Sequence, residues 1–230
     1  MPASHLLLLA PVLLFSIVAH EYAHGYAALT QGDATAYQSG RLTWNPLKHI
    51  DPVMSIIVPL VMFLAHLPVL AGAKPVPVNP RNYRNYRRGD IIVSLAGIAT
   101  NAAIALGCTL MVALLGAIGR GVPVLADTLG ILQAMFLIGL YLNLLLAVFN
   151  LLPIPPLDGS HVMKYLLPPA WAMQYQRLGL YGIFIVLLLL QTRFLQYWLF
   201  PAAYVSFVLR GAVSPLVLPS ALQWLPPWAP

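Results

Sequence analysis

The stretch Ala19-His20-Glu21-Tyr22-Ala23-His24-Gly25 lies inside an apolar run that begins near Leu6. On an α-helix, His20 and His24 project from one face with Glu21 beside them. Two imidazoles at this spacing can bind one zinc ion while the carboxylate serves as a base, the pattern written HExxH. On a soluble helix, such a pair is often a surface coincidence or part of the core. Here Glu21 is the only glutamate in the chain and lies among apolar residues, where ionisable groups are usually functional.

The composition is that of a membrane protein. Of 230 residues, 60% are hydrophobic and 8% charged, the mean hydropathy is +0.81, and several runs could cross a hydrocarbon core of about 30 Å. The basic residues behind the net charge of +6 flank these runs, so they indicate topology and not nucleic-acid binding. The single cysteine, Cys108, excludes an intramolecular disulfide and a cysteine metal cluster. We expect one domain, 1–213, with a catalytic core of about 6–161 and an interfacial Pro/Trp-rich tail, 214–230.

The apolar runs predict an all-α polytopic membrane protein with about five transmembrane helices and short extended pieces near the site. The expected helices are residues 6–29, 90–118, 129–152, 178–190 and 195–213. A further apolar run, 52–70, is interrupted by prolines and by His66, so we expect a re-entrant or broken segment there. The proline-rich residues 72–80 cannot form a regular helix and are expected to be extended.

A second motif follows the fourth apolar run: Asn150-Leu151-Leu152-Pro153-Ile154-Pro155-Pro156-Leu157-Asp158-Gly159. Two histidines leave a catalytic zinc ion short of its usual three protein ligands, and a carboxylate at a helix break can supply the third. Asp158 is the candidate. The alternative is an Asp-Gly turn that caps the next helix.

Together, these motifs resemble those of the site-2 protease family of intramembrane zinc metalloproteases. The resemblance covers about Leu6 to His161 and includes the small-residue segment Ser94–Asn101. Ile98 stands there in place of the usual proline, so the resemblance does not predict the backbone conformation at this point. The chain is similar to the compact branch of that family, which has no PDZ or CBS module.

The resemblance implies one Zn²⁺ ion bound by His20, His24 and Asp158, with Glu21 as general base. Asn150 matches the family asparagine near the catalytic centre and would steady the oxyanion, although helix capping is a competing role. The substrate would be a transmembrane protein that presents an extended piece, and residues 72–79 would either pair with it or serve only as a connector.

The zinc site also constrains topology, because one ion must contact both His20 and Asp158. The first and fourth runs must then end at the same membrane depth, which requires that 52–70 does not cross fully. Under this arrangement, ten of the twelve Lys and Arg residues lie on the side of the zinc motifs and two on the other side. If 52–70 crosses fully, the division between the two sides is the weaker eight against four. The positive-inside rule therefore predicts a multi-pass cell-membrane protein with its active site toward the cytoplasm and its N-terminus outside.

Other polar residues have structural interpretations. We expect Asn101 and Asn143 to form interhelical hydrogen bonds, and His161 to lie at the membrane interface or beside the metal ligands without binding the metal. We expect Asp51 to cap the segment that follows it rather than to gate access to the site.

Two other functions fit parts of the sequence. A non-proteolytic chaperone or transporter would keep a structural metal site, but such a site has no need of Glu21 as a base. A zinc hydrolase that acts on lipids differs from a peptidase only in substrate. The sequence does not identify a regulatory or presenting partner.

Overall fold

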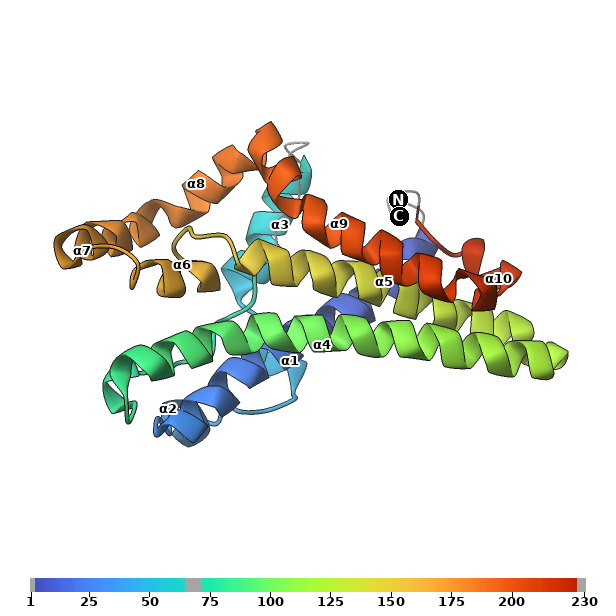
Figure 1. Ribbon diagram of the computed structural model, residues 1–230, viewed down its shortest axis with the longest axis horizontal. Helices are drawn as coiled ribbons and strands as arrows, with labels where there is room; N and C mark the ends of the chain where they lie inside the picture. Colours follow the sequence, from blue (N-terminus) through green and yellow to red (C-terminus); the bar gives the residue numbers. More distant parts are fainter. Residues whose placement is uncertain (1–2, 65–71, 227–230) are drawn as a thin grey trace. The chain divides into compact units, whose positions relative to one another are not determined.

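A computed structural model describes residues 3–64 and 72–226 as helices joined by loops, with no β-strand among them (Figure 1). Four helices within these ranges are long and apolar enough to cross a membrane: Leu7–Gln31, Tyr86–Gly121, Pro123–Asn150 and Arg193–Leu216. The chain is therefore an all-α membrane protein, as its sequence predicts.

Four of the five predicted helices, 6–29, 90–118, 129–152 and 195–213, are observed as long helices. The α-helices are α1 (Ala3–Gln31), α2 (Thr35–Gln38), α3 (Val58–Leu64), α4 (Tyr86–Gly121), α5 (Ala126–Asn150), α6 (Asp158–Met163), α7 (Pro169–Arg177), α8 (Gly182–Leu189), α9 (Arg193–Val213) and α10 (Pro219–Leu222). The apolar run 178–190 instead forms a 3₁₀ turn, Leu178–Tyr181, followed by α8. Eight residues of α-helix extend only about 12 Å, so α8 alone is too short to cross a membrane.

The run 52–70 is not one regular helix. A π-helical turn, Pro52–Ile57, precedes the seven-residue α3. Asp51 Oδ1 accepts a hydrogen bond of 2.8 Å from Val53 N, which confirms the expected cap. Residues 65–71, including His66, lie outside the described residues, so re-entry into the membrane stays a prediction.

Helix α1 ends in a Schellman motif, in which two backbone amides close the last turn. Gly32 adopts φ +109° and donates its N–H to Leu29 O, while Asp33 N donates to Ala28 O. A residue in this left-handed conformation is most easily glycine. The chain therefore turns sharply at the end of α1, two residues beyond the predicted helix end at residue 29.

Contacts divide the chain into two compact units. Unit 1 comprises Met1–Ser16, Ala99–Phe149 and Gln196–Pro230, and unit 2 comprises Ile17–Ile98 and Asn150–Leu195.

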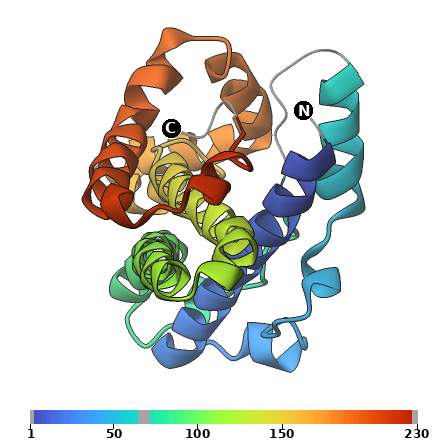
Figure 2. The same cartoon turned by 90° about the vertical axis from the view of Figure 1, so that its right-hand side faces the viewer.

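Unit 1 is built around parts of α4, α5 and α9 (Figure 2). Their side chains Val112, Leu137 and Val213 form a buried cluster. The fully buried Gln133 on α5 ties the tail to this cluster. Its Nε2 donates to Val112 O and Leu216 O at 2.8 and 3.0 Å, and its Oε1 accepts from Leu218 N at 2.7 Å. The start of the tail is thus fixed by a buried polar residue whose amide nitrogen and oxygen both form hydrogen bonds.

The two asparagines in unit 1 differ. Asn143 Nδ2 donates to Ser16 Oγ at 2.9 Å, which confirms the expected bond between α5 and α1. The Asn101 side chain is buried, but neither of its polar atoms has a hydrogen-bond partner in the described part of the chain. The interhelical bond expected for Asn101 is not found there.

In unit 2, residues 72–79 form a non-helical segment, which we call the strap. Lys74 N donates to His49 O at 2.8 Å, and Asn79 N donates to Asp33 Oδ2 at 2.6 Å. The strap is therefore fixed near both ends by hydrogen bonds from its own backbone amides. Its non-helical backbone agrees with the extended piece that the sequence predicts.

Candidate metal centre

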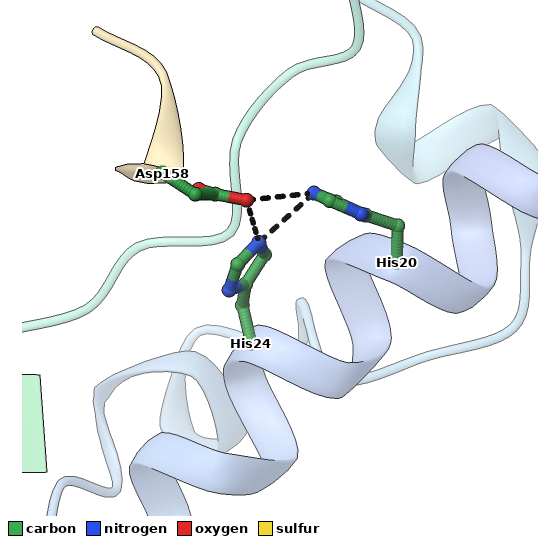
Figure 3. Close-up of side chains that lie close together, drawn as sticks. All are labelled: His20, His24 and Asp158. Atoms are coloured by element: carbon green, nitrogen blue, oxygen red, sulfur yellow. Dashed lines mark hydrogen bonds and ion pairs between the residues drawn. The ribbon is translucent and has the colours of Figure 1, made fainter. Parts of the chain in front are cut away.

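Three side chains from two distant parts of the sequence meet in unit 2 (Figure 3). His20 and His24 lie one turn apart on α1, and Asp158 is the first residue of α6. The two histidine Nε2 atoms are 3.0 Å apart, and Asp158 Oδ2 is 3.3 Å from each. Within residues 3–64 and 72–226, no other group of three His, Cys, Asp or Glu residues brings its ligand atoms so close.

These separations fit a zinc ion. Zinc binds imidazole nitrogen and carboxylate oxygen at about 2.0–2.2 Å, so two ligands of a tetrahedral ion are about 3.3–3.6 Å apart. The observed 3.0 and 3.3 Å are close to these values. Two neutral imidazoles and one carboxylate also form a ligand set typical of catalytic zinc, with the fourth position left for water or substrate.

Helix α4 shapes the histidine side of the centre. His24 Nδ1 donates to Val93 O at 2.7 Å, which fixes the ring and turns Nε2 toward the ligand cluster. A Cβ atom on Gly97 would lie 2.5 Å from His20 Cε1 and from His24 Nε2. Glycine is therefore required at residue 97 for the two rings to pack against this helix.

The Asp158 carboxylate is turned toward the histidines. The residue before α6, Leu157, is extended and makes no side-chain cap, and Asp158 is the first helical residue. Burial raises the pKa of Asp158, but the neighbouring His20 and His24 outweigh it and hold the pKa below its ordinary value.

The Glu21 carboxylate is held by the strap. Its Oε2 accepts a hydrogen bond of 2.8 Å from Val76 N. The Val76 side chain is buried, and its Cγ1 would be 3.0 Å from a Cβ atom on residue 25. Gly25, the last residue of the first motif, therefore lets the strap approach α1 closely enough for this bond.

The remaining candidates lie nearby in sequence. Asn150 is the last residue of α5 and is half-buried. His161, on α6, places Nδ1 3.5 Å from Asp90 Oδ1. It contacts α4, so it supports the element that carries Asp158.

Comparison with known proteins gives consistent results. The chain is 36% identical over 200 residues, 87% of each chain, to "Putative zinc metalloprotease YwhC" of Bacillus subtilis (strain 168). It is 32% identical over 209 residues to "Putative zinc metalloprotease Rip2" of Mycolicibacterium smegmatis (strain ATCC 700084 / mc(2)155), covering 89% of this chain and 74% of that protein. The chain belongs to the site-2 protease family. Membership confirms the predicted family, its zinc metalloendopeptidase class and its zinc cofactor.

A Rip2 protein of Mycobacterium tuberculosis (strain ATCC 25618 / H37Rv) is 31% identical to the chain over 203 residues, covering 86% of this chain and 72% of that protein. No family profile and no solved structure matches the chain.

The structure also adds what the sequence did not reveal. Helix α4 continues without a break through Ile98, which answers the question raised by the missing proline. The Val93 carbonyl carries no side-chain signature, so its bond to His24 could not be predicted. The small residues of Ser94–Asn101 were the available signal for a close approach at Gly97.

Proposed function

We propose that this chain is an intramembrane zinc endopeptidase that cleaves transmembrane or membrane-embedded peptides, with His20, His24 and Asp158 as zinc ligands. The observation that carries the proposal is the place of the site along a helix able to cross a membrane. His20 is about 20 Å from the start and about 17 Å from the end of Leu7–Gln31. A metal site there acts on peptide bonds within the bilayer.

A bound zinc ion would lower the pKa of a water molecule toward about 7 and polarise the substrate carbonyl. Glu21 would accept the water proton and return it to the leaving amine. The Val76 N–H holds Glu21 Oε2, which leaves Oε1 for this proton. The Asn150 amide would donate to the oxyanion that develops on the substrate carbonyl.

The strap is the proposed place for the substrate. Carbonyls of a transmembrane helix are locked in internal hydrogen bonds, so cleavage needs a locally extended substrate. The strap carries the amide that holds Glu21, and its residues 75 and 77 are prolines without an N–H. A substrate strand that pairs along the strap would therefore donate hydrogen bonds to its carbonyls at these positions.

The proposed orientation places the site toward the cytoplasm and the N-terminus outside. Its support is the excess of basic residues on the side of the zinc motifs, including the four arginines between residues 81 and 88. With Cys108 replaced by alanine, a cysteine at residue 84 should be labelled only after the cells are opened. Labelling from outside intact cells would overturn the orientation.

The function is tested on detergent-purified protein by zinc analysis and by cleavage of a transmembrane peptide, an unfolded soluble peptide and a lipid ester. Wild type should hold about one zinc ion and cleave the transmembrane peptide, and Glu21→Gln should keep zinc but lose about 10²-fold or more of the rate. Asp158→Ala should lose zinc. Asp127→Ala, which changes an exposed aspartate on α5, should keep both the zinc ion and the cleavage rate.

Cleavage of the lipid ester alone would replace the peptidase with a lipid hydrolase. Zinc binding without any Glu21-dependent hydrolysis would favour a non-proteolytic protein with a structural metal.

A further inference from the structure

Asp90 is a buried acid outside the ligand set, in the first part of α4. Its side chain is only 4% exposed and forms an ion pair of 2.5 Å with Lys164, whose side chain is 8% exposed. Tyr165 donates its hydroxyl to Asp90 Oδ2 at 2.9 Å, and His161 Nδ1 is 3.5 Å from Oδ1. The guanidinium of Arg87 lies 5.4 Å from the centre of the Tyr165 ring.

Within the described part of the chain, the three polar partners of the Asp90 carboxylate all come from α6 and the turn that follows it. Helix α6 has only six residues and begins with Asp158. A helix this short has no stability of its own, so its position depends on tertiary contacts. The Asp90 carboxylate provides such contacts about 9 Å along the chain direction from Asp158, at the other end of the same helix.

The same face of α4 also contacts both histidines. Asp90, Val93 and Gly97 are spaced three and four residues apart, so they lie on one stripe of the helix. Val93 O fixes the His24 ring, and Gly97 makes room for both rings. One helix face thus touches the ligands from α1 and, through Asp90, the element that carries the third ligand.

We infer that Asp90 is a positioning residue, which holds α6 so that Asp158 reaches the zinc ion bound by His20 and His24. This inference rests on the proposed function. A buried ion pair is a poor source of net stability, because desolvation of both charges offsets their attraction. Its effect here is to fix one geometry, since Lys164 can reach Asp90 only when α6 lies where it does.

The test compares zinc affinity, the visible absorption spectrum of the Co²⁺-substituted protein and the thermal unfolding of metal-free protein. In Asp90→Asn combined with Lys164→Met, both charges disappear, so no unpaired charge is left buried. We expect zinc affinity to fall about 10- to 100-fold and the cobalt spectrum to change, while metal-free unfolding stays near that of wild type.

Asp33→Asn is the matched control, because Asp33 is also a fully buried aspartate of unit 2 with polar partners, none of them on α6. It should lower thermal stability but leave zinc affinity and the cobalt spectrum unchanged. If the double variant does not fold, Tyr165→Phe takes its place, since it removes one hydrogen bond to Asp90 and should weaken zinc binding about 2- to 10-fold.

Wild-type zinc affinity and cobalt spectrum in the folded Asp90 variant would overturn the inference. Where Tyr165→Phe is used in its place, wild-type zinc affinity and cobalt spectrum in that variant would overturn the inference as well. A wild-type protein that binds no zinc, or that binds it equally well after His20→Ala, would instead overturn the proposed function itself.

Discussion

Replacement of Gly97 by alanine should separate metal binding from folding. The added Cβ would lie 2.5 Å from His20 Cε1 and His24 Nε2 and 2.6 Å from His20 Nε2. Carbon atoms in good contact with such atoms lie about 3.5–4.0 Å away, so the overlap is about 1 Å or more. Either α4 or both imidazoles must move by about that amount, and a tetrahedral zinc site tolerates only about 0.2 Å.

The effect on the helix has the opposite sign. Alanine in a helix interior is favoured over glycine by about 1 kcal/mol, so Gly97→Ala should not weaken α4 itself. We expect zinc affinity to fall at least about 100-fold, by the loss of ideal ligand placement, while metal-free protein keeps its helical circular dichroism. Isothermal titration with a competing chelator measures the affinity.

The matched control is Gly107→Ala, on the same helix, where a Cβ would meet no atom within 4 Å. It should have the same favourable helix propensity and bind zinc as wild type does. Equal zinc affinity in the two variants would refute the view that Gly97 is present to admit the histidine rings.

Three further predictions follow from the contacts. Val76→Pro removes the N–H that holds Glu21, so it should lower kcat/KM by about 10-fold or more with zinc content unchanged. The control Val78→Pro should have little effect on kcat/KM. Equal losses of kcat/KM for the two variants in a peptide cleavage assay would contradict this prediction. Gln133→Leu should destabilise the protein by about 1–3 kcal/mol, measured by thermal unfolding, because it leaves buried backbone groups without partners. Burial raises the pKa of Asp33, but hydrogen bonds from the backbone of residue 79 and from neighbouring side chains hold the pKa below its ordinary value. The contribution of the ionised carboxylate to the free energy of unfolding is therefore complete above about pH 4 and is lost as the pH falls through the lowered pKa. The free energy of unfolding of Asp33→Asn should change less than that of wild type when the pH is lowered through this range.

The sequence predicted those features that leave a periodic or compositional trace. The helix that carries His20 and His24 could be recognised because its apolar run is long and its histidines are one turn apart. Asp158 could be proposed as a partner because a zinc ion needs a third ligand and a helix break offered a carboxylate. The structure brings these three residues together.

The contacts that support the site could not be predicted in this way. The bond from His24 goes to a backbone carbonyl, and every residue has one. Asp90 and Lys164 are 74 residues apart and meet only after α4 and α6 pack together. Because Asp90 lies at the start of a long apolar helix, its sequence position indicates only the end of that helix at the membrane boundary. Similarly, Gln133 differs from an exposed glutamine only in what surrounds it.

The strap provides a way to observe Glu21, the proposed general base, without any substrate. Its eight residues include two prolines, so only six backbone amides can exchange their hydrogen with solvent deuterium, and that of Val76 is the one bonded to Glu21. The isotope exchange rate of this single amide therefore reports how often the carboxylate is released. A peptide that displaces the strap from Glu21 would accelerate that exchange, and one that binds alongside it would slow it.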